Sequence, residues 1–459
     1  MANKTLITNG AKISQVQQVY FSPVAVIPPV TNTPFASLYC FLARVDPWDD
    51  ENNPPMPTED VRYTKNVFKN IFAARHITAT DISPVIQRID WTSGTIYDVY
   101  DDTIDMMALD NNGMLLKMFY VKNKYDQVFK CLWNNNGGSS TVEPYFEPGT
   151  YNTNNVFQGS DMYKWKYMYT IDIGSKLKFM DTSWMPVPIG SNTPNPNTTA
   201  GSGSIDVINV TYGGGLYDPA NAAITVTVTG DGTGATGTAV VSGSAITDIV
   251  VTNPGSNYTY ANVSITSSLG FSATAVAPTS PIGGHGYDPI SELACSHVML
   301  SVEFNGSESG LIPTDITYHQ VGILTNPTLN SLSNSTSGYT PASGDIYKTT
   351  TDFVVAPGFG TYQNDEIIYQ GDSIDTATFF GTILSFDPAT NVVRVLNMTG
   401  TPITNAPIKG AVSKTTRTLL QYITPDFQIF SGYISYIENR TGVQRSTDGI
   451  EQYRFVLGY

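Results

Sequence analysis

The sequence predicts a mainly β protein that contains two small all-β modules between longer segments. Short runs of β-branched and aromatic residues alternate with polar ones and end at Gly, Asn or Pro, as strands joined by turns do. An internal repeat lies within residues 205–282, and a second group of short apolar runs lies within 331–415. These observations favour strands and hairpins over helices for most of the chain.

The composition is that of a folded, acidic protein. The chain has 459 residues, 24 basic and 39 acidic side chains, a formal net charge of −15 and 41% hydrophobic residues. This length and composition allow about two to four folded units. Cys40, Cys131 and Cys295 lie far apart and outside any CxxC pattern, so we expect neither a zinc site nor a disulfide framework. No apolar run reaches the roughly 18 residues of a membrane span, so none is expected.

Residues 179–347 contain no Lys and no Arg. Phosphate and nucleic-acid partners are bound mainly by these two residue types. The segment instead offers acids such as Asp206, Asp231, Asp248 and Glu292. We therefore expect no nucleic-acid partner, and we interpret the segment as a scaffold or recognition region.

One long helix is predicted near the N-terminal third of the chain. Residues 57–60 (PTED) supply an N-cap and acids for the first turn, and Val67, Phe68, Ile71 and Phe72 fall on one face of the helix that follows. We expect this apolar face to pack against a sheet. The basic opposite face either stays in solvent or meets an acidic partner.

A connector rich in Pro, Asn and Gly, residues 186–196, separates the Trp-rich first part from a repeat. Three positions of the repeat recur at a constant offset of 41 (258 − 217): Ile208, Gly214 and Tyr217 return as Ile249, Gly255 and Tyr258. Two copies predict a small all-β module.

The motif GGGLYDP at 213–219 also returns as GGHGYDP at 283–289. Such Gly-rich loops need positive φ angles, and their tyrosine can fix the turn to a sheet. We interpret both as structural loops. A catalytic or metal role for His285 and Asp288 is the weaker alternative, because no second set of ligands is visible.

Short strand-like runs at 345–347, 365–371, 381–386 and 392–396 predict another small β-barrel or sandwich module. A Ser/Asn/Thr-rich stretch at 331–337 precedes them and is typical of a flexible tether.

Patterns of known catalytic sites are not matched. GTGATG at 232–237 fits a dinucleotide motif, but a β-prone run follows it where a helix is required. We predict no cofactor, no metal and no enzymatic activity. Asp101, Asp102 and Asp105, or the acids within 46–51, could serve as glycosidase carboxylates or calcium ligands, but acids in Asn/Pro turns are more typical of solvated loop tips.

Six blocks of sequence, in this order, resemble the baseplate wedge subunits (gene eight products) of T-even-type contractile-tailed phages. The blocks are RVDPW at 44–48 with PPMPT at 54–58, VIQRIDW at 85–91, GSDMYKWKYMY at 159–169, QVGILTNP at 320–327, SGYISYIENR at 431–440 and a final strand at 451–457. The resemblance covers about residues 1–190, 290–330 and 420–459. It leaves the two predicted modules as insertions in surface loops.

The resemblance implies a β-sandwich core with a few helices in loops, interrupted by two small all-β inserted modules. The expected division is core at 1–204, 283–330 and 416–459, with modules at 205–282 and 331–415. It further implies a structural, non-enzymatic protein of the virion tail baseplate, made in the host cytoplasm. The implied partners are a second copy of itself and other wedge proteins.

Four residues are candidate interface residues. Trp133 lies beside a polar loop that contains Asn135, where an aromatic ring often marks a contact; the alternative is a ring that anchors the sheet. Glu438 and Arg440 lie on one face of a C-terminal strand. They either pair with charges on a neighbouring strand or subunit, or stay in solvent.

Two other functions stay open. The inserted modules could form an adhesin that binds glycans of the host surface, with Tyr212, Tyr217, Tyr258 and Tyr260 as the candidate platform. A tail-associated glycan hydrolase is the more remote alternative, since it needs only two carboxylates at a suitable separation.

Overall fold

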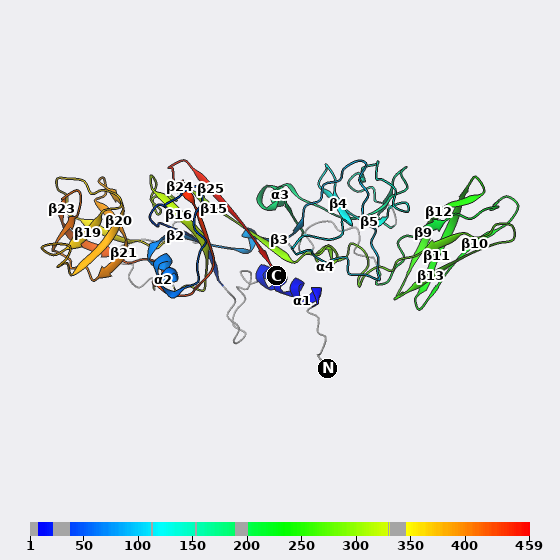
Figure 1. The fold of residues 1–459 in the computed structure, drawn as a ribbon, viewed down its shortest axis with the longest axis horizontal. Helices are drawn as coiled ribbons and strands as arrows, with labels where there is room; N and C mark the ends of the chain where they lie inside the picture. Colours follow the sequence, from blue (N-terminus) through cyan, green and yellow to red (C-terminus); the bar gives the residue numbers. More distant parts are fainter. Residues whose placement is uncertain are drawn as a thin grey trace, which may run out of the picture. The chain divides into compact units, whose positions relative to one another are not determined.

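A computed structural model describes residues 8–21, 37–111, 113–151, 154–188, 201–328, 330 and 346–459 (Figure 1). The fold is mainly β, as predicted. Two compact units share the chain: unit 1 comprises 1–19, 83–299 and 456–459, and unit 2 comprises 20–82 and 300–455. The predicted tether and most of the predicted connector lie outside the described residues.

A four-stranded antiparallel sheet forms the first part of unit 1. Its strands follow the order β4 (Tyr120–Lys122), β5 (Gln127–Trp133), β7 (Lys164–Thr170), β6 (Val156–Gln158). Because side chains alternate between the faces of a strand, one face of β5 and β7 collects the aromatic rings. The buried cluster on this face contains Tyr97, Val121, Phe129, Cys131, Phe146, Tyr163, Trp165 and Tyr167.

The internal repeat of the sequence folds as two interleaved halves. Its strands are β9 (Asn209–Tyr212), β10 (Ile224–Gly230), β11 (Thr233–Ser242), β12 (Ala245–Ser256), β13 (Ala261–Ser267) and β14 (Thr274–Val276). β9 pairs with β14, β11 with β12, and β10 with β13. Each pair therefore joins one strand from each half, so the repeat forms one module rather than two.

The two recurring tyrosines join the halves. The Tyr217 hydroxyl accepts from Ala273 N (3.3 Å) and its ring packs on Gly270, while the Tyr258 hydroxyl accepts from Ala235 N (3.3 Å) and its ring packs on Gly232. Each tyrosine thus fills a glycine-lined site in the other half. Both rings are buried, so Tyr217 fixes its Gly-rich loop as predicted, whereas Tyr287 of the second Gly-rich loop is 55% exposed.

A five-stranded sheet lies in unit 2, in the order β17 (Ile346–Lys348), β2 (Ile71–His76), β1 (Leu38–Ala43), β16 (Thr317–Thr325), β24 (Tyr433–Gln444). A four-stranded sheet has the order β25 (Ile450–Gly458), β15 (His297–Asn305), β3 (Ile82–Gln87), β8 (Trp184–Pro186). Within unit 2, the Tyr318 hydroxyl of β16 meets the Tyr453 hydroxyl of β25, and Tyr436 packs edge-on against Phe455. This two-layer packing agrees with the expected β-sandwich core.

The predicted long helix is shorter than expected. α2 spans Val61–Asn70, and Asp60 caps it by accepting from Tyr63 N (2.8 Å), as predicted. Val67 is buried in the sheet-facing cluster. Ile71 and Phe72, however, belong to β2, because the backbone turns extended at Ile71 and pairs with β1. The longest helix, α1 (Asn9–Phe21), was not predicted.

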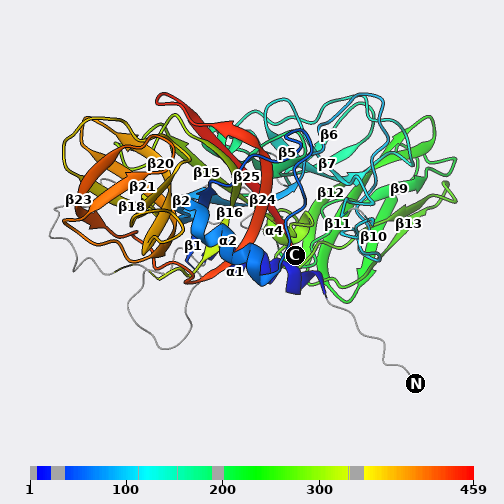
Figure 2. The ribbon, with the colours of Figure 1, turned by 60° about the vertical axis from the view of Figure 1, so that its left-hand side comes forward.

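The second predicted module is a closed six-stranded barrel, whose strands surround a common interior (Figure 2). They are ordered β18 (Thr351–Val355), β21 (Val392–Gly400), β20 (Phe379–Asp387), β19 (Ile367–Gln370), β22 (Pro407–Gly410), β23 (Thr416–Ile423). β23 closes the barrel and lies beyond the boundary expected at 415.

The boundaries of the two compact units differ from the boundaries expected for the core. The expected first part, 1–204, is divided between residues 82 and 83, and the expected second part, 283–330, between 299 and 300. Alternating patterns indicate that a segment is a strand but do not say which distant strand it pairs with. For this reason the division could not be predicted from the pattern.

The Tyr217 site gives a first test. Ala at position 270 would place its Cβ inside contact distance of the Tyr217 ring, whereas Ala at position 215 would meet nothing closer than 3.9 Å. We expect Gly270→Ala to lower the free energy of unfolding by about 1–3 kcal/mol and Gly215→Ala to change it little. Thermal unfolding of both variants measures this. Equal midpoints would contradict the interleaved packing.

Candidate functional site

Three lysines lie on the face of the β5–β7 sheet opposite its aromatic cluster. Lys130, Lys164 and Lys166 are 1%, 5% and 2% exposed. In the strand register Lys130 lies directly across from Lys166. Like charges at opposed positions repel each other, and a buried ammonium group is costly to desolvate. This face therefore requires anions from elsewhere in the chain.

Asp206 meets Lys166. Lys166 Nζ lies 2.7 Å from Asp206 Oδ2 and donates to the Asn154 carbonyl oxygen, also at 2.7 Å. Ser204 Oγ donates to the second carboxylate oxygen of Asp206 (3.1 Å). Burial opposes ionisation, but the charges of Lys166 and His285 hold the pKa of Asp206 below its ordinary value.

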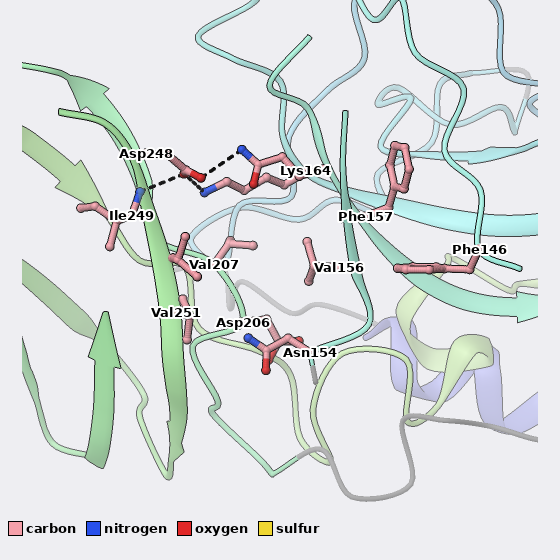
Figure 3. A pocket seen from close by; sticks show the side chains of 12 residues that line it. Phe146, Asn154, Val156, Phe157, Lys164, Asp206, Val207, Asp248, Ile249 and Val251 are labelled. Carbon is pink, nitrogen blue, oxygen red and sulfur yellow. Dashed lines mark hydrogen bonds and ion pairs between the residues drawn. The ribbon is translucent and has the colours of Figure 1, made fainter. Parts of the chain in front are cut away.

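Asp248 meets Lys164 at 2.7 Å, and Lys164 Nζ also donates to the Ile208 carbonyl oxygen at 3.0 Å. Gln158 Nε2 donates to the second oxygen of Asp248 at 3.0 Å. Figure 3 shows these groups at one end of a pocket and Asp206 with Asn154 at the other. Burial lowers the pKa of Lys164, and the charge of Asp248 opposes this.

Glu292 and His285 meet Lys130. Lys130 Nζ lies 3.1 Å from Glu292 Oε2, 3.2 Å from His285 Nδ1 and 3.9 Å from the centre of the Tyr100 ring. Gly286 N donates to the other oxygen of Glu292 (2.7 Å). Burial lowers the pKa of both Lys130 and His285. Burial alone would raise the pKa of Glu292, but Lys130 and His285 together hold it below its ordinary value.

We call these three contacts the lysine–carboxylate interface: Lys130–Glu292, Lys164–Asp248 and Lys166–Asp206. Each acid lies in the segment that has no Lys or Arg, and each lysine lies in the Trp-rich first part. Every one of the six residues is at most 8% exposed. Charged groups that are buried and paired in this way fix the position of one segment on another.

The pocket in Figure 3 has a volume of about 520 Å³. Phe146, Val156 and Phe157 line it from the side of the β5–β7 sheet, and Val207, Ile249 and Val251 line it from the module. Its charged residues, Lys164, Asp206 and Asp248, already belong to the interface. The pocket therefore lies between two ion pairs, with apolar side chains lining it from both sides.

A second, larger cavity of about 780 Å³ also lies in unit 1, and we call it the aromatic groove. On one side it is lined by residues 98–104, Lys117, Trp133 and Asn134. On the other side it is lined by Asn209 and by residues 259–263 and 275–278 of the module.

The four candidate interface residues lie in different compact units. Trp133 is partly buried and lines the aromatic groove, and Asn135 is exposed in a turn with φ of 51°. Both lie in unit 1, whereas Glu438 and Arg440 lie in unit 2. Glu438 and Arg440 pair with each other at 3.2 Å along β24, and each is more than a third exposed. Such a pair contributes little stability.

The candidate glycan platform is corrected in part. Tyr217 and Tyr258 are 1% and 5% exposed and belong to the module core, so they cannot stack on a ligand. Tyr212 and Tyr260 are 61% and 56% exposed. Only Tyr260 lines the aromatic groove.

The acids considered as catalytic or calcium ligands accept hydrogen bonds or form ion pairs within the chain. Asp101 accepts from Thr103 N (2.9 Å), Asp102 from Thr279 N (2.9 Å) and Asp105 from Met107 N (3.0 Å). Glu51 lies 3.1 Å from His319, and Asp288 caps α4 (Pro289–Glu292). Among the described residues, no group of three or more His, Cys, Asp or Glu side chains is placed to hold a metal ion.

The pairing of these lysines and acids was not predicted from the sequence. The sequence does, however, contain a pattern that places two of the lysines on one face of a strand. In KWKYMYT (Lys164–Thr170) two lysines alternate with aromatic residues, which puts both lysines on one face of a strand. Asp206, Asp248 and Glu292 were singled out only as charges that repel polyanions. Pairing between the two sets depends on the tertiary fold.

No protein-family model matches this chain, and no curated protein matches it. In the part of the chain that the structure describes, no helix is both long enough and apolar enough to cross a membrane.

Replacing one member of a buried ion pair should lower the free energy of unfolding more than replacing both members. Lys166→Met leaves Asp206 buried without its cation, and we expect a loss of about 3–5 kcal/mol in the free energy of unfolding. The double variant Lys166→Met/Asp206→Val should recover most of this loss, because Ser204 keeps Ser280 as a partner. Lys124→Met, at an exposed pair with Glu143, is the matched control and should change little. Denaturant unfolding measures all three; additive losses in the double variant would refute the pairing.

Acid should weaken unit 1 in two stages. The pKa of His285 is lowered in the folded state, so the unfolded chain binds the proton first and stability falls below about pH 6.5. The pKa values of Asp206 and Glu292 are also lowered, so their contribution is present above about pH 4 and is lost as the pH falls through their folded values. Thermal unfolding followed by tryptophan fluorescence measures both stages.

The control for the first stage is His285→Gln. This variant should show a smaller decrease in unfolding temperature, with His297, whose pKa is also lowered by burial, giving the remainder. The role of His285 would be contradicted if the unfolding temperature of the wild type stayed constant until the pH reached the range in which Asp and Glu titrate.

Proposed function

We propose that this chain is a structural subunit of a phage tail baseplate wedge and acts as a non-enzymatic scaffold. The observation that carries the proposal is the lysine–carboxylate interface. Two of its buried ion pairs anchor the inserted module on the β5–β7 sheet, and the third anchors the segment that follows the module. The resemblance of the sequence blocks to wedge subunits supplies the assembly in which such a scaffold would work.

A scaffold acts by holding its parts in one arrangement. Apolar contacts alone tolerate sliding, whereas each buried charge is stable only opposite its partner. Lys164 and Lys166 bind two different acids of the module, so a shift of the module would break both pairs at once. The interface therefore favours one position of the module on the sheet.

Exposed apolar side chains supply surfaces for neighbouring subunits. In α3 (Ile173–Phe179), Ile173 and Leu177 lie one turn apart and are 70% and 69% exposed. In unit 2, Ile429, Phe430 and Tyr433 are each about half exposed where β24 begins at the edge of its sheet. Large apolar groups in solvent and strand edges are both typical of protein contacts.

We place the homodimer contact at the start of β24, and contacts with other wedge proteins at α3. In this proposal the protein is made in the host cytoplasm and functions in the virion. A host-surface adhesin is the second candidate function, and the aromatic groove is the observation that favours it.

Size-exclusion chromatography with light scattering tests the dimer. We expect the full chain at micromolar concentration to have about twice the monomer mass of 49.8 kDa. Tyr433→Asp should shift it towards monomer, because an uncompensated charge in an apolar contact is costly to desolvate. Val412→Asp, at a barrel residue that is 64% exposed, is the matched control.

Monomer at every concentration would count against the dimeric scaffold. A dimer that Tyr433→Asp leaves intact would overturn the placement of the contact at β24.

A further inference from the structure

The aromatic groove has the features of a ligand site rather than of a packing defect. It combines aromatic rings from different segments, among them Trp133 at the end of β5 and Tyr260 before β13, with several polar side chains. Trp133 is partly buried, and Tyr260 is 56% exposed. Aromatic faces beside polar groups suit the apolar C–H faces and the hydroxyl groups of sugars.

Asn209 supplies an independent observation. It lines the groove, is 1% exposed, and donates from Nδ2 to the Leu132 carbonyl oxygen at 2.9 Å. This bond fixes the amide, and within the part of the chain that the structure describes its buried Oδ1 has no partner. A buried acceptor without a donor is unfavourable. A hydroxyl group at the floor of the groove would satisfy it.

The charges of the groove select among glycans. Asp98, Asp101 and Asp102 line it, and among the described residues that line it Lys117 alone is basic. Lys117 is already paired with Asp98 at 3.1 Å. The remaining negative charge repels sulfated, phosphorylated and uronic acid sugars, and it accepts neutral sugars or sugars with a free amine.

We propose that the aromatic groove binds a short segment of a neutral polysaccharide. One sugar ring stacks on Trp133 or Tyr260, and a hydroxyl donates to Asn209 Oδ1. The interface that anchors the module also keeps the two sides of the groove together, since the groove lies between the sheet and the module. This inference goes beyond the scaffold function and gives the virion subunit a ligand of its own.

A glycan array probed with the full chain tests the proposal. The array carries neutral oligosaccharides, amino sugar oligomers, and sialylated, phosphorylated and uronic acid glycans. We expect binding to neutral glycans, little to anionic ones, and a loss of roughly tenfold or more in affinity for Trp133→Ala and Tyr260→Ala. Tyr212→Ala, which removes a similarly exposed ring outside the groove, is the control and should bind as the wild type does.

Three results would overturn the proposal: wild-type protein that binds no neutral glycan, preferential binding of anionic glycans, or equal binding by wild type, Trp133→Ala and Tyr260→Ala. Asp101→Asn adds a test of charge, because its Oδ1 can still accept from Thr103. It should keep neutral glycan binding and weaken the discrimination against anionic glycans. The mass of the particle in solution tests the scaffold separately, so the two proposals can fail independently.

Discussion

The structure of unit 1 depends on one electrostatic constraint, the burial of Lys130 directly across from Lys166 on adjacent strands. Two opposed ammonium groups away from water are unfavourable unless anions reach them. Asp206 and Glu292 come from one stretch of the chain without a single Lys or Arg, so no Lys or Arg within that stretch competes for them. The absence of Lys and Arg from residues 179–347 therefore helps to specify the fold.

The same segment carries a second constraint, which acts within the module. Its repeat is interleaved, so Tyr217 of one half is enclosed by the other half, and Tyr258 is enclosed in return. The threonine pairs 211–274 and 236–252 follow the same exchange, with hydroxyl separations of 2.7 and 2.8 Å. Because each tyrosine is buried only when the other half is in place, the two halves are expected to fold together. A module built this way can then be anchored as one body by the lysine–carboxylate interface.

The sequence predicts much of this fold and little of its candidate site. Strand alternation, the offset repeat and the Asp60 cap are local patterns, and local physics decides them. The predicted end of α2 was wrong because Ile71 pairs with β1, and this tertiary contact overrides the helical pattern of the sequence. Trp133 and Tyr260 lie 127 residues apart in sequence and share a groove only because the module docks beside the sheet. That docking depends on charge pairing between distant segments, for which a single sequence contains no local signal.

The most direct measurement is the reactivity of individual lysines in the folded protein. Brief treatment with an amine-acylating reagent, followed by peptide mass spectrometry, gives a rate for each lysine. If the interface holds, Lys130, Lys164 and Lys166 react only when unit 1 opens, and therefore far more slowly than Lys124, whose side chain is 64% exposed. Rates equal to that of Lys124 would show that the three lysines are open to solvent, and the anchored module would then have no physical basis.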